Sequence, residues 1–151
     1  MTEKRKVIGI SIGAYLLSLF LPSVQRIDGS YAYGWEMLTD GLVGVFFGIT
    51  LLVHLELTPL LHVSPWFANI LWFLCLIQVE LDLFNKWMIL PVLTVLFMAG
   101  YVFNPVVLCN GFGVETELST PVYGYYLWVI SGIILLIYSI FKWRTRKDDF
   151  N

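Results

Sequence analysis

Charged side chains are scarce in this chain. Only 13% of its 151 residues are Asp, Glu, Lys or Arg, whereas 58% are hydrophobic, and an average soluble domain has about 25% charged residues. So few charges do not cover the surface of a globule of this size. The scarcity predicts an integral membrane protein and argues against a soluble one.

Residue types that support chemistry are also rare. The two cysteines, Cys75 and Cys109, lie in apolar surroundings, and the two histidines, His54 and His62, are eight residues apart. No Cys-x-x-Cys or Cys/His cluster indicates a metal site, and no nucleophile–base set or phosphate-binding loop is present. The net charge of -2 argues against nucleic-acid binding. We therefore expect no enzyme activity, no cofactor and no metal.

The sequence contains four long runs without formal charge, at 7–25, 57–79, 87–114 and 118–141. A helix needs about 20 mostly apolar residues to cross a bilayer. The runs predict an all-α membrane protein, with residues 1–151 forming a single integral membrane domain built as a four-transmembrane-helix bundle. The expected spans are about 7–24, 65–82, 87–107 and 121–142. The basic start, MTEKRK, also suits a signal peptide, but no A-x-A-like cleavage site follows it, so we expect the first helix to be retained.

A fifth apolar stretch, residues 41–55, is short. As a helix, the uncharged run between Asp40 and Glu56 would be about 22 Å long, which is less than the roughly 30 Å hydrocarbon core. It predicts a re-entrant or interfacial helix in a first outer segment, 25–64, with a short spanning helix as the alternative. Three glycines share one face of such a helix and would let another backbone approach closely: Gly41, Gly44 and Gly48.

The distribution of Lys and Arg predicts the orientation, because these residues are enriched on the cytoplasmic side of membranes. With four spans, every Lys and Arg except Arg26 lies on the side of the two termini. Both termini are therefore expected to be cytoplasmic, and 25–64 and 108–120 are expected to be outer segments. If residues 41–53 crossed the membrane, the asymmetry would fall from eight against one to six against three.

The first outer segment contains two local patterns. Asp28-Gly29-Ser30 is typical of a turn. Tyr31, Tyr33 and Trp35 have amphipathic rings that favour a membrane–water interface. Their alternation is also that of a short strand, and we favour the anchoring role over the strand.

Four polar residues near helix ends are candidates for a role. Asn69 and Asn104 are expected near the outer ends of neighbouring helices, where a hydrogen bond between them would contribute about 1 kcal/mol; lining a substrate path is the alternative. Glu80 and Asp82 are expected at an inner end, hydrated and paired with Lys86. The alternative is a functional role, since carboxylates within a membrane are costly and usually functional.

Two short motifs resemble those of a group of small, uncharacterised multi-pass proteins of bacterial inner membranes. They are Trp66-Phe67-Ala68-Asn69 and the sequence GYYLWVIS, which begins at Gly124. This chain departs from the group at Ile70, where the group often has proline. The resemblance implies a location in the bacterial inner membrane and a four-helix topology, and it implies no activity.

We therefore predict a non-enzymatic multi-pass membrane interaction protein, either an accessory subunit of a membrane complex or an immunity or regulatory protein. Its expected partners are the lipid bilayer and another protein or a second copy of the chain. A small oligomeric transporter or channel is the alternative, followed by an enzyme acting on lipid or quinone at the outer interface. A specific site, if present, is expected where the glycine face of 41–55 meets the outer ends of the helices that carry Asn69, Asn104 and Gly124.

Overall fold

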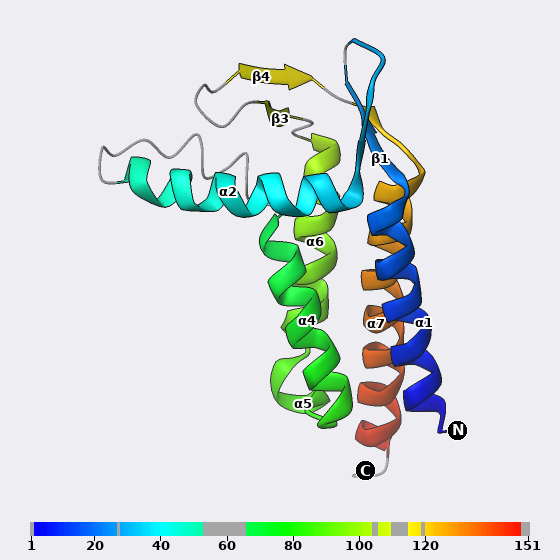
Figure 1. Ribbon diagram of the computed structural model, residues 1–151. Coiled ribbons are helices and arrows are strands. Elements are labelled where there is room, and N and C mark those ends of the chain that lie inside the picture. The colour runs from blue at the N-terminus through cyan, green and yellow to red at the C-terminus, as the bar shows by residue number, and fades with distance from the viewer. Residues whose placement is uncertain are drawn as a thin grey trace.

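Four helices lie side by side in the computed structural model, and another helix crosses one end of them (Figure 1). The structure describes residues 2–26, 28–52, 66–103, 106–109, 115–118 and 120–148. The side-by-side helices are α1 (Glu3–Phe20), α4 (Phe67–Glu80), α6 (Ile89–Phe103) and α7 (Tyr123–Asp148). The short α5 (Phe84–Trp87) follows α4 and precedes α6 in the sequence. The crossing helix is α2 (Gly34–Leu52). Both termini lie at the end of the bundle opposite α2 (Figure 1).

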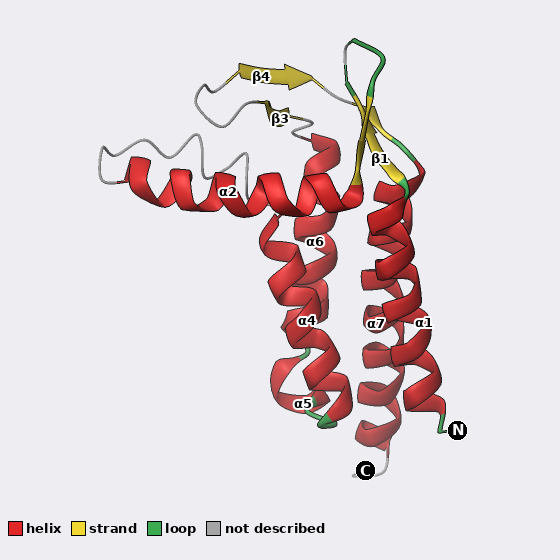
Figure 2. Ribbon diagram, viewed as in Figure 1, coloured by secondary structure: helices red, strands yellow, loops and turns green. Residues whose placement is uncertain are grey.

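Short strands accompany α2 at its end of the bundle (Figure 2). Antiparallel strands β1 (Pro22–Gln25), β2 (Tyr31–Tyr33) and β5 (Thr120–Pro121) form a sheet in the order β2-β1-β5. A second antiparallel pair joins β3 (Val106–Cys109) to β4 (Glu115–Leu118). The sequence alternation at Tyr31 and Tyr33 is therefore that of a strand, which was the less favoured interpretation.

The turn between β1 and β2 is the one expected from the sequence. The backbone N–H of Ser30 donates to Asp28 Oδ1 over 2.8 Å, and Gly29 has a φ of 83°, a conformation that glycine adopts without strain. Hydrogen bonds from Ser30 lower the pKa of the Asp28 carboxyl. The prediction of a turn at Asp28-Gly29-Ser30 is confirmed.

Small residues bring α1 and α7 together. Ser11 of α1 and Ser131 of α7 are both fully buried, and Ser11 Oγ donates to the Ser131 carbonyl over 2.9 Å. Trp72 of α4 donates from its Nε1 atom to Ser11 Oγ over 3.2 Å. Small side chains allow helix backbones to approach, and the buried hydroxyl is then satisfied across the interface. This contact fixes α1, α4 and α7 at mid-bundle.

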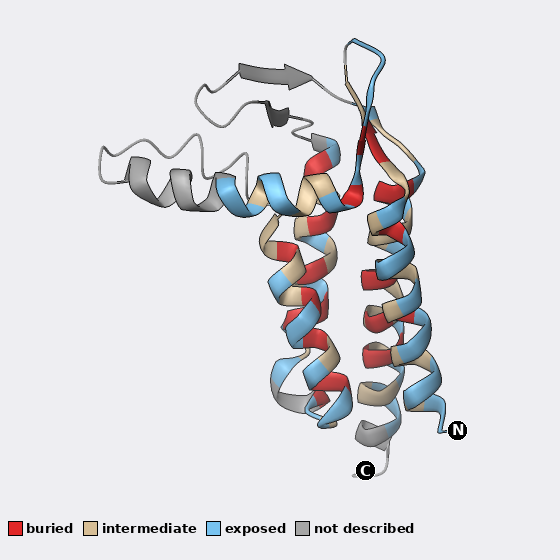
Figure 3. Ribbon diagram, in the orientation of Figure 1, coloured by how far each residue is buried: buried red, intermediate tan, exposed pale blue. Residues whose placement is uncertain are grey.

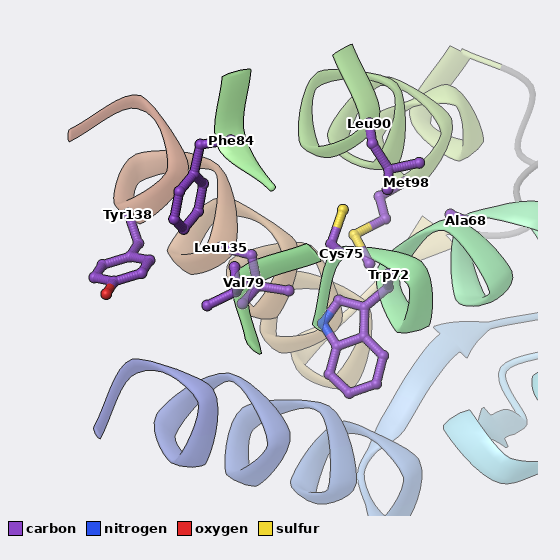
Figure 4. Close-up of a cluster of buried hydrophobic side chains, with 9 residues drawn as sticks. All are labelled: Ala68, Trp72, Cys75, Val79, Phe84, Leu90, Met98, Leu135 and Tyr138. Carbon is purple, nitrogen blue, oxygen red and sulfur yellow. The ribbon is translucent and has the colours of Figure 1, made fainter. Parts of the chain in front are cut away.

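An apolar core fills the space between α4, α6 and α7 (Figure 4). Its members on α4 recur at the spacing of one helix face, and they meet side chains from α5, α6 and α7. The buried members are Ala68, Trp72, Cys75, Val79, Phe84, Leu90, Met98, Leu135 and Tyr138. Gly132 of α7 leaves room for Met98, because a Cβ there would lie 2.6 Å from the Met98 sulfur.

Ionic contacts close the end of the bundle that carries the termini. Lys4 Nζ donates to Asp82 Oδ2 over 3.1 Å and to the carbonyl of Glu80 over 2.8 Å. Lys142 Nζ lies 3.9 Å from Glu3 Oε2. The predicted pairing of Glu80 and Asp82 with Lys86 stays a prediction, although Asp82 also pairs with the first turn of α1 and Glu80 contributes its carbonyl there. The side chain of Lys86 lies outside those that the structure describes.

The predicted four-transmembrane-helix bundle is wrong. Within the described part of the chain, only α7 is long and apolar enough to cross a membrane, over the 23 residues Tyr123–Thr145. The 14 residues of α4 and the 15 of α6 give lengths of about 21 and 23 Å, below the roughly 30 Å hydrocarbon core. The 18 residues of α1 include a first turn that is entirely charged, EKRK.

The error has a physical cause. Charge-free runs were equated with helices, but the ends of two runs form strands. The expected span 7–24 ends in β1, and the expected span 87–107 ends in β3. The chain is therefore not all-α either. The helix expected at 41–55 runs instead from Gly34 to Leu52, because Glu36 supports an earlier start by accepting the backbone N–H of Tyr33 over 2.8 Å.

A substitution at Gly124 tests whether α7 packs closely on β1. A Cβ at Gly124 would lie 2.6 Å from Ser23 Oγ and 2.8 Å from the carbonyls of Leu21 and Pro22. Gly124→Ala should lower the free energy of unfolding by about 1–3 kcal/mol. Gly100→Ala is the matched control, since its Cβ would meet nothing within 4 Å, and it should raise stability by about 0.5–1 kcal/mol. Thermal unfolding in detergent, followed by near-ultraviolet circular dichroism, measures both, and a Gly124→Ala protein as stable as the wild type would contradict the packing.

Candidate functional site

A partly open cavity of about 90 Å³ lies where α2 crosses the bundle. Residues of α1, β1, α2, α4, α6 and α7 line it, so every long helix contributes a wall. Aromatic rings form much of the lining, together with the amide of Asn69. The lining residues with a polar atom or an aromatic ring that matter most here are Ser18, Trp66, Asn69, Tyr101, Tyr125 and Trp128.

The Asn69 side chain is the hydrogen-bonding centre of this region. Its Oδ1 accepts the hydroxyl of Tyr15 and the indole N–H of Trp128, each over 3.0 Å. Because the indole N–H of Trp128 can only donate, the amide oxygen must face it, and this assigns the orientation of the amide. Its Nδ2 donates one hydrogen to the carbonyl of Trp66 over 3.0 Å. Among the described residues, the second hydrogen of Nδ2 has no partner.

Trp66 connects this centre to α2. Its indole N–H donates to the carbonyl of Leu38 over 2.8 Å, and a Cβ at Gly41 would overlap the same ring. A Cβ at Gly34 would overlap the Ser18 carbonyl at the end of α1. Two glycines of α2 therefore allow the helix to lie directly on the bundle and to cover the cavity.

Tyr101, Tyr125 and Trp128 form an aromatic wall of the cavity, and contacts among their rings hold this wall in place. The rings of Tyr101 and Tyr125 have centroids 5.4 Å apart, and those of Tyr125 and Trp128 are 6.0 Å apart. The Tyr125 hydroxyl donates to the Met98 carbonyl over 2.8 Å. The ring of Tyr15 is stacked on that of Trp72 at 4.1 Å. Rings fixed at both the face and the hydroxyl form a rigid apolar surface.

Charge lies outside this lining. No Asp, Glu, Lys or Arg is among the residues that line the cavity. The acids of α2 that are nearest along the helix are Glu36, next to the lining residue Met37, and, two residues after Leu38, Asp40. Desolvation raises the pKa of the Asp40 carboxyl, Arg26 lowers it, and Glu36 raises it. The cavity therefore suits a neutral group.

The residues expected to form a site are divided between the two ends of the molecule. Asn69 lines the cavity, and Gly41 and Gly124 pack beside it against Trp66 and Ser23. Glu80 and Asp82 lie at the opposite end, beside Lys4. The remaining candidates are not described at the level needed: Gly44 and Gly48 lie in α2 but their surroundings are outside the described side chains, and Asn104, His54 and His62 are outside the described residues. The predicted Asn69–Asn104 hydrogen bond stays a prediction.

Sequence reasoning missed the partners of Asn69. Tyr15 and Trp128 were taken as part of apolar helices, and Trp66 only as part of a motif. The sequence contains no clear signal for them, because Tyr15 lies in the middle of the first charge-free run, 7–25, whereas Asn69 and Trp128 lie near the starts of their helices.

This arrangement offers binding rather than acid–base chemistry. Its polar groups are hydroxyls, indole N–H groups and one amide, and most are engaged with one another. In the part of the chain that the structure describes, no group of three or more His, Cys, Asp or Glu side chains is placed to hold a metal ion. No protein-family model, curated protein or solved structure matches this chain, so function has to be inferred from the geometry.

The Asn69 network can be tested by a double-mutant cycle. Asn69→Ala leaves the Tyr15 hydroxyl and the Trp128 indole N–H without an acceptor, and it should cost about 2–4 kcal/mol of stability. In a Tyr15→Phe background the same change should cost about 0.5–2 kcal/mol less, because one of the two donors is already gone. Tyr126→Phe, at an exposed ring, is the control and should change stability by less than about 0.5 kcal/mol. Additive losses for Asn69→Ala and Tyr15→Phe, measured by denaturant unfolding, would show that the two side chains do not act together.

Proposed function

We propose that this protein is a non-enzymatic membrane interaction protein that α7 holds in the bilayer. The carrying observation is the apolar outer surface of the bundle. Large hydrophobic residues on α1, α4, α6 and α7 are half exposed or more, and Figure 3 shows exposed positions along these helices. They include Ile10, Leu17, Phe20, Phe73, Leu96, Val102, Ile137 and Phe141.

Such a surface is unusual for a protein that is surrounded by water. Monomeric soluble proteins rarely expose contiguous apolar patches larger than a few hundred square ångströms. Here Phe20 is 73% exposed, Ile137 is 63% exposed and Phe73 is 60% exposed. Lipid around α7, and lipid or a partner chain against the outer faces of α1, α4 and α6, would cover this surface.

The two ends of α7 support its position across a bilayer. The exposed rings of Tyr123 and Tyr126 lie at its start, near the exposed rings of β2, and Lys142 and Arg144 lie near its end. From Tyr123 to Lys142 the helix is about 28 Å long, close to the thickness of the hydrocarbon core. Aromatic and basic residues favour the membrane–water interface.

Charge supports one orientation within this proposal. The basic residues Lys4, Arg5, Lys6, Lys142 and Arg144 gather at the end of the bundle that carries both termini. The cytoplasmic side is enriched in Lys and Arg, so we place the C-terminal end of α7 on that side. The bacterial inner membrane is proposed from the resemblance of the Trp66–Asn69 and Gly124–Ser131 motifs.

An interaction role is favoured over catalysis by the kind of groups that are exposed. The described residues present apolar and aromatic surface, and α2 extends past the bundle with Leu42 and Val43 exposed (Figure 1). An accessory subunit or a regulatory or immunity protein uses such a surface to bind a membrane partner. Nothing in the described residues favours the transporter or channel alternative over this proposal.

Membrane insertion can be tested with one charge. Ile137→Lys places an ammonium near the middle of α7, where a charge costs about 2.5–3.5 kcal/mol in a membrane helix. The wild-type protein should stay in the membrane pellet after alkaline carbonate washing, and Ile137→Lys should appear in the supernatant or in aggregates. Thr145→Lys, at the end of the span, should behave as the wild type. Wild-type protein in the carbonate supernatant would contradict the proposal.

The interaction role can be tested by photo-cross-linking in native membranes. A benzophenone amino acid at Phe73 of α4 or Leu96 of α6 should give at least one discrete adduct with a protein, because these side chains are exposed and apolar. The same probe at buried Met98 is the control and should give only intramolecular products. Lipid adducts alone at both exposed positions, with a monodisperse particle that contains no partner in mild detergent, would contradict an interaction protein while leaving membrane insertion intact.

A further inference from the structure

The cavity beneath α2 combines features that point to a ligand. It has an apolar aromatic wall, and it has one amide whose oxygen is occupied by two donors. The Nδ2 atom of that amide keeps a hydrogen without a partner among the described residues, although Asn69 lines the cavity. A buried or half-buried donor left unpaired is costly, so a bound group with an acceptor oxygen would stabilise the site.

The lining restricts the chemistry of that group. Its indole N–H donors are already used, by Leu38 for Trp66 and by Asn69 for Trp128. The hydroxyl of Ser18 donates to the carbonyl of Tyr15 over 2.6 Å. No charged side chain is present to neutralise a phosphate or an ammonium group, and burying an uncompensated charge is strongly unfavourable. The group is therefore neutral, mostly hydrocarbon, and carries an acceptor oxygen.

Size and position restrict it further. The cavity of about 90 Å³ is smaller than the roughly 150 Å³ cavity that accepts a benzene ring, so a short segment of a flexible chain fits better than an aromatic ring. The cavity is formed by the last turn of α1, the beginnings of α4 and α7, and the sheet end of the bundle. In the proposed membrane position, this is the level of the exposed aromatic side chains, where the ester groups of lipids lie.

We propose that this cavity binds the acyl-ester segment of a membrane glycerolipid. The ester carbonyl accepts the second hydrogen of Asn69 Nδ2, and the first methylene groups lie among Trp66, Tyr101 and Tyr125. This site rests on the proposed membrane location. It adds a bound lipid to that proposal, positioned so that α2 and the bundle helices enclose it together.

The test uses the full-length protein in nanodiscs with photoactivatable phosphatidylcholine. One lipid carries a diazirine beside the ester carbonyl, and a second carries it at the end of the acyl chain. Mass spectrometry of peptides should find the ester-proximal label on the segments of Trp66, Tyr101 or Tyr125. The chain-end label should instead be found on outward residues such as Phe73.

A cavity-filling variant makes the test specific. Met37→Trp enlarges a side chain of α2 that lines the cavity, and it should reduce ester-proximal labelling of the cavity segments about tenfold, as expected when a tight subsite is occupied. Leu17→Phe, on the exposed face of α1, is the matched control and should leave labelling unchanged. A circular dichroism melt checks that both variants are folded, and Ser18→Leu, which fills the cavity from α1, replaces Met37→Trp if that variant is not.

Three outcomes would overturn the assignment. Cavity labelling that neither filling variant reduces would place the lipid outside the cavity. Loss of wild-type labelling on adding an equimolar short-chain quinone would show that the preferred group is a quinone ring rather than a glycerolipid ester. Labelling of Phe73 without labelling of the cavity segments would reject the lipid site and leave the membrane location standing, whereas the absence of both labels would reject the two together.

Discussion

The hydrogen bonds of the Asn69 carboxamide are the interaction on which the α2 end of this molecule depends. It accepts from Tyr15 of α1 and Trp128 of α7 at one oxygen, and its nitrogen donates to the backbone where α4 begins. Trp66, one turn earlier, extends the connection to α2 through Leu38. Three helices, α1, α4 and α7, are thus connected by a single planar group, and Trp66 adds α2. In an apolar environment such bonds are strong, and an unmade one is costly, so the network specifies one arrangement.

Different kinds of interaction hold the two ends of the bundle together: ionic contacts at one end and neutral hydrogen bonds at the other. At the end with the termini, Lys4 bridges α1 to the segment after α4 through Asp82 and a carbonyl, in contacts that are partly exposed and so weakly stabilising. At the other end, neutral donors and acceptors are enclosed by rings. The first kind of contact tolerates water and membrane headgroups, and the second requires their exclusion. The helix α2 provides that exclusion, since Gly34 and Gly41 let it lie against α1 and Trp66 without intervening side chains.

The sequence showed which long stretches are apolar, but it did not show where each helix ends. The scarcity of charge indicated apolar helices, and Asp28-Gly29-Ser30 indicated a turn, which follows from local preferences of the backbone alone. The number of spans did not follow, because a charge-free run such as 87–114 includes both α6 and β3. Strand pairing at Tyr31–Tyr33 depends on β1 across the turn and on β5 much later in the chain. Asn69 was a candidate because it is a polar residue near a helix end, but its partners lie on helices that looked uniformly apolar, so a partner was sought in Asn104.

A change of packing direction explains why a cavity exists where it does. The end of α6 reaches the start of α7, where the rings of Tyr101 and Tyr125 are in contact. At this level a helix runs across the bundle (Figure 1) and a small sheet begins, and neither follows the ridges and grooves of parallel helices. Rings of Trp66, Tyr101 and Tyr125 fill most of that junction, but rigid planar groups leave gaps that flexible side chains would close. The void therefore lies at the one level where the hydrogen-bonding centre and the aromatic wall meet.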